Sequence, residues 1–273
     1  MSQAAPAPFE ISVEVVPPAG PDAGKLLARL KALEKLPFQR FSVATNPLAR
    51  PHMSALALST LIQQHSGKMA TLHCTTRDHN RLSLQGLLWG ARALGIASVL
   101  VASGDYVALG EGSWTTTVRD VDVYDLVGMA REAGLRTGVV LDPRPETGRL
   151  AYEVRRLEQK VQAGAQFVVT QPVYDAEAAG TLAEATAGLG VPIMLGVLPL
   201  RNGRHARFLD RKVAGIAVPR AVEERLAKAA DPAAEGLALA REMLALARER
   251  FGGACLMPAF GDYGQVTAIL EGG

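Results

Sequence analysis

The sequence predicts an α/β protein that forms a single (β/α)8 barrel, a TIM barrel, from 273 residues. Short apolar, β-branched segments alternate with longer segments in which apolar residues recur at helical spacing. Eight such pairs follow one another without a break in composition. A chain of about 250 residues is an ordinary length for one such barrel. We therefore expect residues 1–9 to form a flexible tail and residues 10–273 to form one barrel domain.

The clearest unit of this pattern spans residues 69–105. Its first segment, 69–74, is short and apolar, and a stretch with leucines at helical spacing follows it. Gly95 is well placed to end that helix. Residues 96–102 are again apolar and β-branched, and Asp105 comes shortly after them. This is the strand–helix–strand unit of a parallel sheet.

The other elements follow from the same signals. Ser54 and Asp175 are side chains that cap helix N-termini, and short helices are expected on either side of Pro219. The long loop 106–120 is rich in Gly and Thr, and loops of this length in compact domains are usually functional or mobile. One leucine stripe predicts a helix from Leu26, Leu30, Leu33 and Leu36. The remaining strands are expected at residues 11–16, 41–45, 136–141, 167–171, 192–198 and 254–257.

Composition excludes several classes of protein. The formal net charge of +2 gives no electrostatic argument for binding nucleic acid or an anionic membrane. There is no apolar run long enough to span a bilayer, and residues 1–10 lack the pattern of a signal peptide. Cys74 and Cys255 are the two cysteines, so a disulfide framework and a cysteine-rich metal site are excluded. We expect a cytoplasmic protein without a metal.

Polar residues at the carboxyl ends of the strands are the candidates for chemistry, because active sites of such barrels lie there. Glu14 lies among valines of the first strand, where burying an unpaired charge is costly. It is either paired with a neighbouring Arg or Lys or a general acid with a raised pKa. His73 ends the third strand. It is either a residue of the site or a histidine of the core whose hydrogen bonds are satisfied within the protein. Asp105 follows Gly104, which allows a ligand close to the backbone; its alternative role is to cap a turn.

Two further candidates lie on the second half of the chain. Gln171 ends the sixth strand, and its amide offers both a donor and an acceptor to a planar heterocycle. Lys160 lies near the end of the preceding helix, where a cation also complements the helix dipole. Taken singly, none of these residues identifies a function.

Five motifs together resemble the methylenetetrahydrofolate reductase family, in the family's order. They are SVEVVPP, LHCTTRDHNR, LVASGD, RRLEQKVQAGAQFVVTQPVYD and IMLGVLPL. The TTRDHNR and TQPVYD segments resemble most closely the branch that is fused to homocysteine methyltransferase domains.

The resemblance implies a barrel that binds FAD at the carboxyl ends of its strands. Hydride would pass from NADH or NADPH to the flavin and then to 5,10-methylenetetrahydrofolate, giving 5-methyltetrahydrofolate for one-carbon metabolism and methionine biosynthesis. Glu14 would be the general acid that opens the folate ring to an iminium ion. Asp105 would stabilise that cation and bind the pterin, and Gln171 would be another pterin contact. The implied flavin contacts are His73, Ser103, Gly104, Asp105, Arg156 and Lys160.

Several positions depart from the better-known bacterial members. Ser103 stands where they have an Arg, Gly203 stands where an aromatic residue stacks on the substrate, and a basic residue for the folate tail is replaced around Asp262. Two alternatives therefore stay open. One is a flavin-free enzyme with direct hydride transfer from NADH to the folate. The other is a folate-binding protein or methyltransferase component without reductase activity. The choice of nicotinamide and a homo-oligomeric state are also open.

Overall fold

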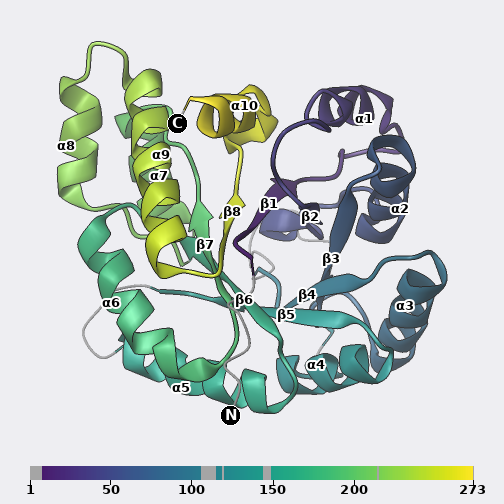
Figure 1. Ribbon diagram of the computed structural model, residues 1–273. Helices are drawn as coiled ribbons and strands as arrows, with labels where there is room; N and C mark the ends of the chain where they lie inside the picture. Colours follow the sequence, from purple (N-terminus) through teal and green to yellow (C-terminus); the bar gives the residue numbers. More distant parts are fainter. Residues whose placement is uncertain (1–7, 106–114, 119, 144–148, 214, 273) are drawn as a thin grey trace.

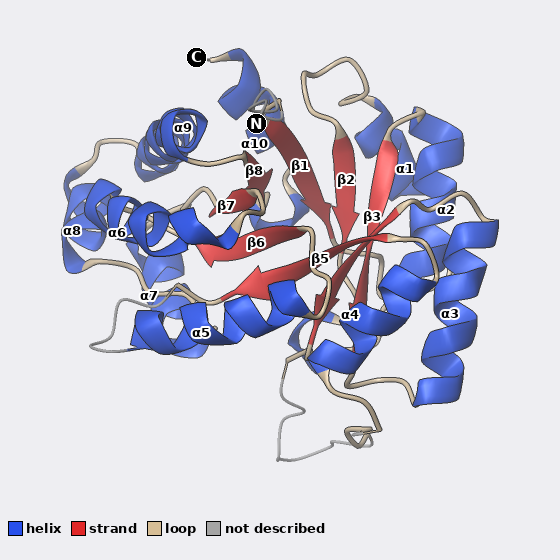
Figure 2. Ribbon diagram, turned by 60° about the horizontal axis from the view of Figure 1, so that its bottom comes forward, coloured by secondary structure: helices blue, strands red, loops and turns tan. Residues whose placement is uncertain are grey.

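The computed structural model describes residues 8–105, 115–118, 120–143, 149–213 and 215–272. In these residues eight parallel strands close into a barrel in the order of the sequence. Helices surround the strands on the outside (Figures 1 and 2). The predicted single (β/α)8 barrel is therefore confirmed. Most of the predicted long loop 106–120 lies outside the described residues, as do residues 1–7 of the predicted tail.

The bounds of the strands agree with the predicted segments to within two residues. The strands are β1 (Glu10–Val15), β2 (Arg40–Val43), β3 (Met69–Thr75), β4 (Ser98–Ala102), β5 (Arg136–Leu141), β6 (Phe167–Pro172), β7 (Ile193–Val197) and β8 (Gly253–Leu256). The helices are α1 (Gly24–Lys31), α2 (Ala55–Ser66), α3 (Arg81–Ala93), α4 (Val123–Glu132), α5 (Arg149–Gln162), α6 (Ala176–Thr186), α7 (Gly203–Lys212), α8 (Arg220–Lys228), α9 (Pro232–Arg250) and α10 (Gly264–Glu271).

Side-chain caps explain where many of the helices begin. A short polar side chain at the N-cap accepts a hydrogen bond from a backbone N–H that has no partner within the helix. Asp122 also forms a capping box with Asp125 at the start of α4. The capping residues are Ser54, Asn80, Asp122, Asp175, Asn202 and Asp231.

Alternate residues of each strand face opposite sides of the barrel wall. Val13 and Val15 belong to the large core between the barrel and its helices, so Ser12 and Glu14 face the barrel interior. A separate buried cluster fills part of that interior; it comprises Leu100, Phe167, Val169, Met194 and Cys255. A third cluster lies under α7, α8 and α9, with Leu200, Leu209 and Leu226 among its members.

An ionic cluster lies at the amino ends of the strands. The guanidinium of Arg40 donates to Glu10, and Arg136 Nη1 lies 3.0 Å from Glu10 Oε2. The Arg136 guanidinium also lies over the ring of Phe167, 4.6 Å from its centroid. These contacts connect β1, β2, β5 and β6 at the end of the barrel opposite the candidate residues.

The structure differs from the predicted elements in three places. Helix α1 ends at Lys31, although Leu33 and Leu36 beyond it are still buried. Phe9, at the end of the predicted tail, packs against the core. Helix α10 after β8 had not been predicted.

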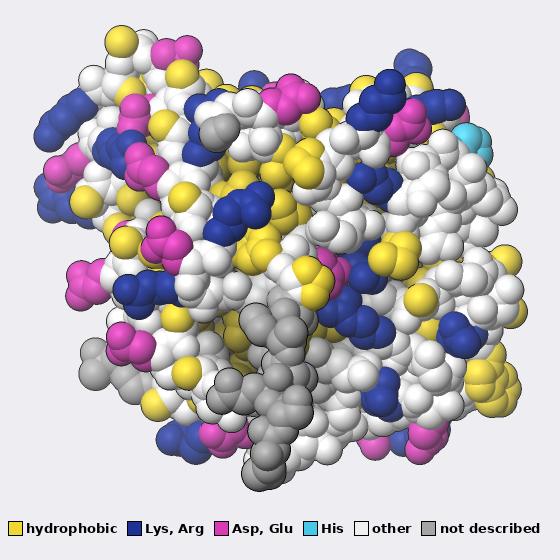
Figure 3. Space-filling model, in the orientation of Figure 1, with side chains coloured by type: hydrophobic (Ala, Val, Ile, Leu, Met, Phe, Trp, Pro, Cys, Tyr) yellow, Lys and Arg dark blue, Asp and Glu magenta, His cyan; other side chains and the backbone are white. Residues whose placement is uncertain are grey.

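On the face of the molecule seen in Figure 3, neither sign of charge dominates. Acidic and basic side chains are interspersed over the face seen in Figure 3, with an apolar patch near its centre. Among the helices of the described residues, none is both long and apolar enough to cross a bilayer.

Candidate active site

Glu14 faces the interior near the carboxyl end of β1. Its pKa is raised from an ordinary 4.5 to about 7, mainly by burial and in smaller part by the negative charge of Asp105. No ion pair joins Glu14 to another residue of the described ranges, which disfavours the alternative of a paired strand-end carboxylate. A carboxyl group with this pKa is an acid near neutral pH, because a large share of it then holds a proton.

Asp105 lies just beyond the carboxyl end of β4, and two contacts fix it. Its Oδ2 accepts a hydrogen bond of 2.6 Å from the backbone N–H of Leu48. Its backbone carbonyl accepts from Arg77 Nη1 at 3.2 Å. Leu48 has a left-handed backbone with φ 55°, which is unusual for a side chain of this size. The structure thus holds the carboxylate of Asp105 at the barrel mouth, within electrostatic reach of Glu14.

His73 faces the interior from β3 and is neutral. Its Nε2 lies 2.7 Å from Ser42 Oγ on the neighbouring strand, and its carbonyl accepts a hydrogen bond from the Thr45 hydroxyl. Burial lowers the pKa of His73 to about 4. A neutral imidazole has one donor and one acceptor nitrogen, so His73 can contact a ligand with either polarity but does not carry positive charge.

Gln171 lies at the carboxyl end of β6, where the register with β7 shifts between Val169 and Pro172. The segment before α8, which contains Gly215, packs against Gln171. Gly215 has φ +87°, and a Cβ added there would lie 3.1 Å from Gln171 Cγ and 3.3 Å from the carboxyl carbon of Asp142. Only a glycine fits this position without strain, so the segment that contains it constrains the amide of Gln171.

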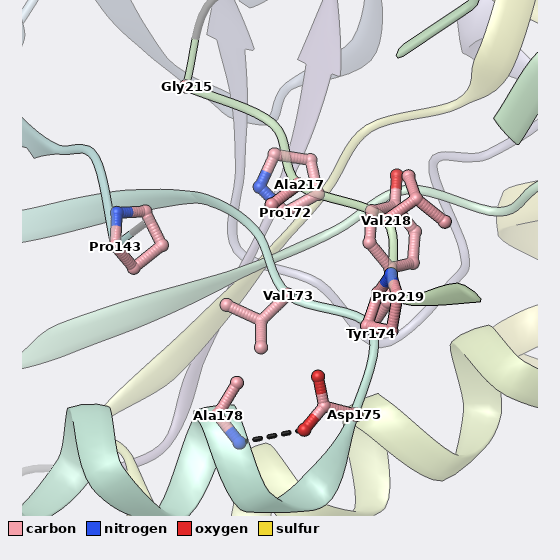
Figure 4. A pocket seen from close by; sticks show the side chains of 10 residues that line it. All are labelled: Pro143, Pro172, Val173, Tyr174, Asp175, Ala178, Gly215, Ala217, Val218 and Pro219. Carbon is pink, nitrogen blue, oxygen red and sulfur yellow. Dashed lines mark hydrogen bonds between the residues drawn. The ribbon is translucent and has the colours of Figure 1, made fainter. Parts of the chain in front are cut away.

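A cavity of about 220 Å³ lies beside this part of the mouth (Figure 4). Its wall is mainly apolar, and the Asp175 carboxylate in it accepts the capping hydrogen bond from Ala178 N at 2.8 Å. An apolar cavity of about 150 Å³ holds a benzene molecule, so this cavity has room for one ring. It is lined by Pro143, Pro172, Val173, Tyr174, Asp175, Ala178, Gly215, Ala217, Val218 and Pro219.

Two candidate cations, Lys160 and Arg156, lie on α5 and contact groups of the chain itself. Lys160 lies on α5, outside the barrel wall, and its ammonium donates to Val140 O at 2.8 Å. Burial, followed by the charge of Arg156, lowers the pKa of Lys160 to about 8. Arg156 itself pairs with Glu153 at 3.2 Å. Both cations therefore bind groups of the chain itself.

Ser103 and Gly104 follow β4 directly. Ser103 is exposed and brings no charge to the position. Gly104 has φ +85°, and a Cβ there would lie 3.0 Å from the Cβ of Arg77. The packing of Arg77 is thus a reason for this glycine that the sequence did not reveal, in addition to the predicted close approach of a ligand.

Three side chains at the mouth were missed by the sequence reasoning. Ser42 is recognised as a residue of the site by its contact with His73 in the structure. Arg77 belongs to the TTRDHNR motif, yet the motif alone gave it no role. Phe260, after β8, is 71% exposed and has φ 56°. The guanidinium of Arg201 lies 5.3 Å from its ring centroid, so an aromatic ring is present at the mouth although Gly203 is not aromatic.

Metal ligands do not gather in the described ranges, where no group of three or more His, Cys, Asp or Glu side chains comes together. The chemistry that this arrangement supports is proton transfer from Glu14 beside a fixed negative charge on Asp105.

Comparison with curated proteins finds methylenetetrahydrofolate reductases. Methylenetetrahydrofolate reductase 2 of Schizosaccharomyces pombe is 26% identical over 201 residues, which are 67% of this chain and 31% of that protein. The 5,10-methylenetetrahydrofolate reductase of Salmonella typhimurium is 26% identical over 152 residues, 55% of this chain and 50% of that protein. The aligned part of the chain thus spans between about a third and a half of these relatives.

Solved structures with the same fold include an uncharacterized protein from Clostridium thermocellum that binds two copies of 5-methyl-5,6,7,8-tetrahydrofolic acid. It has a TM-score of 0.70 at 16% identity, with 97% of this chain and 93% of that chain covered. A 2,3-dimethylmalate lyase is more distant, with a TM-score of 0.54 at 12% identity, covering 97% of this chain and 79% of that chain. At these identities the likeness concerns the fold alone.

The family model described as methylenetetrahydrofolate reductase matches residues 1–253. This match includes β1 with Glu14, the β4 end with Asp105 and β6 with Gln171. The chain belongs to the methylenetetrahydrofolate reductase family.

Proposed function

We propose that this chain reduces 5,10-methylenetetrahydrofolate to 5-methyltetrahydrofolate, with a nicotinamide as the source of hydride. The observation that carries this proposal is the raised pKa of Glu14, which faces the barrel interior within reach of the charge on Asp105. Binding a pterin does not by itself require an acid at this position. The membership of the family and the folate-binding protein of similar fold support a folate as the substrate.

Glu14 would supply the proton for the first step. Protonation of the bridging folate nitrogen N10 breaks its bond to the methylene carbon and leaves an iminium ion on N5. Hydride addition to that carbon then gives the methyl group. Loss of a general acid costs on the order of a hundredfold in rate or more.

Asp105 and Gln171 would act on the pterin. The carboxylate of Asp105 is held by Leu48 at Oδ2, so it is already oriented before the cation forms. A preorganised charge needs no reorganisation during the reaction. Gln171, constrained by Gly215, would offer its amide to the pterin, and Phe260 would offer its exposed ring to the remaining aromatic part of the substrate.

The described residues at the mouth are suitable for contacts with the ring system of a flavin. The neutral imidazole of His73 and the backbone at Gly104 are suitable contacts for a heterocycle, and Ser103 and Asp105 lie next to them. For the pyrophosphate, Lys160 has the charge, and an ammonium has three donors, so it can hold Val140 and a phosphate oxygen together. Arg156 would be a second contact on α5. Bound FAD would supply a two-electron carrier between nicotinamide and folate.

Two features of the residues expected to bind the flavin phosphates favour the flavin-free alternative. Arg156 pairs with Glu153, and Ser103 lacks the charge of the Arg expected there. In that alternative the nicotinamide delivers hydride to the folate directly, and Glu14 and Asp105 keep the same roles.

The experiment is a turnover assay on the purified protein together with its visible spectrum. We expect methylenetetrahydrofolate-dependent oxidation of NADH or NADPH, with 5-methyltetrahydrofolate as the product. A yellow protein, or tight FAD binding by fluorescence quenching, supports the flavin route. Turnover by a colourless protein that binds no FAD supports direct transfer. Folate binding without turnover, with either nicotinamide and with added FAD, contradicts the proposal and favours a binding protein.

A further inference from the structure

The side chain of Arg77 is buried at the barrel mouth and donates hydrogen bonds to Asn46, Asp78 and Asp105. It follows β3 by two residues and is 3% exposed. Its guanidinium binds the neighbouring carboxylate of Asp78 with two parallel hydrogen bonds, 2.5 Å from Nε to Oδ1 and 2.7 Å from Nη2 to Oδ2. Paired bonds of this kind fix both the position and the orientation of the guanidinium plane.

The remaining donors of Arg77 reach the loops on both sides. Nη2 donates to the backbone carbonyl of Asn46, after β2, at 3.1 Å. Nη1 donates to the backbone carbonyl of Asp105, after β4, at 3.2 Å. One buried side chain therefore joins the loops after β2, β3 and β4.

The loop after β2 completes the network. Asn46 Nδ2 donates to Asp78 Oδ2 at 3.1 Å, and Leu48 N–H donates to Asp105 Oδ2 at 2.6 Å. Asn46, Leu48 and Ala49 all have positive φ, between 41° and 55°. Such conformations are costly for residues other than glycine and persist only where the surroundings impose them. Arg77 and Asp105 provide contacts of this kind from one side.

We propose that Arg77 is a positioning residue for the reaction, which fixes the carboxylate of Asp105 opposite Glu14 by clamping the loops after β2 and β4. Arg77 holds the backbone of Asp105 directly and holds its carboxylate through the Asn46–Leu48 segment. This inference rests on the proposed function for the catalytic roles of Asp105 and Glu14, whereas the clamp itself is independent of substrate.

The titratable groups around Glu14 allow a specific readout. Asp105 on the β4 loop is the charged group that raises the pKa of Glu14. The charge on Glu14 is also felt by Cys255 on β8 and by Tyr263 beyond it, but burial raises the pKa values of both, that of Cys255 to about 12. His73 on β3 is neutral above about pH 4. After burial, which is the larger cause, the charge on Asp105 is what raises the pKa of Glu14, so moving Asp105 changes the titration of Glu14 near neutral pH.

The test variant is Arg77→Lys, which keeps the charge but loses the planar fork. A looser Asp105 lies farther from Glu14 on average, so we expect the pKa of Glu14 to fall towards its ordinary value. Carbon-13 NMR titration of labelled carboxyl groups measures this pKa without turnover, with Glu14→Gln as the assignment control. In the turnover assay with methylenetetrahydrofolate, the activity of the variant should begin to fall at a lower pH than that of the wild type. We expect kcat to fall about tenfold or more, since small misplacements at a site are costly, with less change in KM for the folate.

Arg81→Lys is the matched control, because Arg81 is an exposed arginine on the next helix and, among the described residues, its side chain pairs with Asp125 alone, at 3.5 Å. We expect it to leave both the titration and kcat unchanged. Asp78→Asn is the second variant and should shift the titration in the same direction, because it removes the charged partner of the guanidinium. If either Arg77→Lys or Asp78→Asn folds with the wild-type titration of Glu14, the clamp is contradicted. If the titration shifts but the wild-type protein reduces no folate, the proposed function fails and the clamp stands.

Discussion

The carboxyl group of Glu14 and that of Asp105 interact across the barrel mouth, where the charge on Asp105 adds to the effect of burial in raising the pKa of Glu14 to about 7. A large share of Glu14 is therefore protonated near pH 7. The negative charge on Asp105 lies beside it, with Oδ2 accepting a hydrogen bond from the Leu48 N–H. Together the two residues provide an acid and an anionic stabiliser in one site.

Asp105→Asn tests the second of these groups. We expect it to lower kcat more than it raises KM, because the cation that Asp105 is proposed to stabilise forms only after ring opening. The variant also removes the charge that raises the pKa of Glu14, so the fall of activity at high pH should begin at a lower pH. Steady-state kinetics over a range of pH measure both effects. A loss confined to KM would argue against this role.

Gly215→Ala tests the constraint on Gln171. A Cβ at Gly215 would lie 3.1 Å from Gln171 Cγ, so we expect a higher KM for the folate with a smaller effect on thermal stability. Gly190→Ala is the matched control, because Gly190 also has a positive φ, +68°, but no atom within 4 Å of its added Cβ. Both variants carry backbone strain, and the first alone displaces the glutamine. Equal KM values in the two variants would refute the constraint.

Phe260→Ala tests the exposed ring after β8. We expect weaker folate binding, by about five- to tenfold, since an aromatic pair contributes about 1 kcal/mol. Phe208→Ala on α7 removes another exposed ring, which is 49% exposed, and should leave binding unchanged. Isothermal titration calorimetry with the folate compares the two. The same affinity for both variants would mean that Phe260 does not contact the substrate.

Glu10→Gln tests the ionic cluster at the other end of the barrel. Removing one partner leaves the charges of Arg40 and Arg136 partly buried, so we expect a loss of about 1–3 kcal/mol in the free energy of unfolding, below the full cost of a deeply buried pair. Glu224→Gln breaks the exposed pair with Arg220 and should change stability by less than about 0.5 kcal/mol. Chemical denaturation measures both. A Glu10 variant as stable as the control would show that the cluster is not stabilising.

The barrel was predictable because its strands and helices have strong periodic patterns, and because helix N-termini such as those after Ser54 and Asp175 have short polar caps. Helix α10 was not predicted, and Leu33 and Leu36 were assigned to α1 because their spacing continues the stripe although the helix ends at Lys31. Spacing alone does not distinguish a buried turn from a further helical turn.

At the site, Glu14 and Asp105 were found because a carboxylate among valines and a Gly–Asp pair after a strand are local signals. Arg77 and Leu48 were not found, since their importance arises from contacts between loops far apart in the sequence. The positions of Lys160 and Arg156 relative to the mouth also depend on tertiary packing. Residue type and motif therefore indicated the acid and its neighbour, whereas the clamp around them required the structure.

The rate of 5-methyltetrahydrofolate formation against pH, for the wild type and Glu14→Gln, tests the central claim most directly. Since the acid form of Glu14 is the active one, wild-type activity should fall as the pH rises through about 7. The variant should bind folate normally, but its turnover should be at least about a hundredfold slower. Its activity should not fall as the pH rises through about 7. A variant that turns over at the wild-type rate, with the same pH profile, would contradict the assignment of Glu14 as the acid.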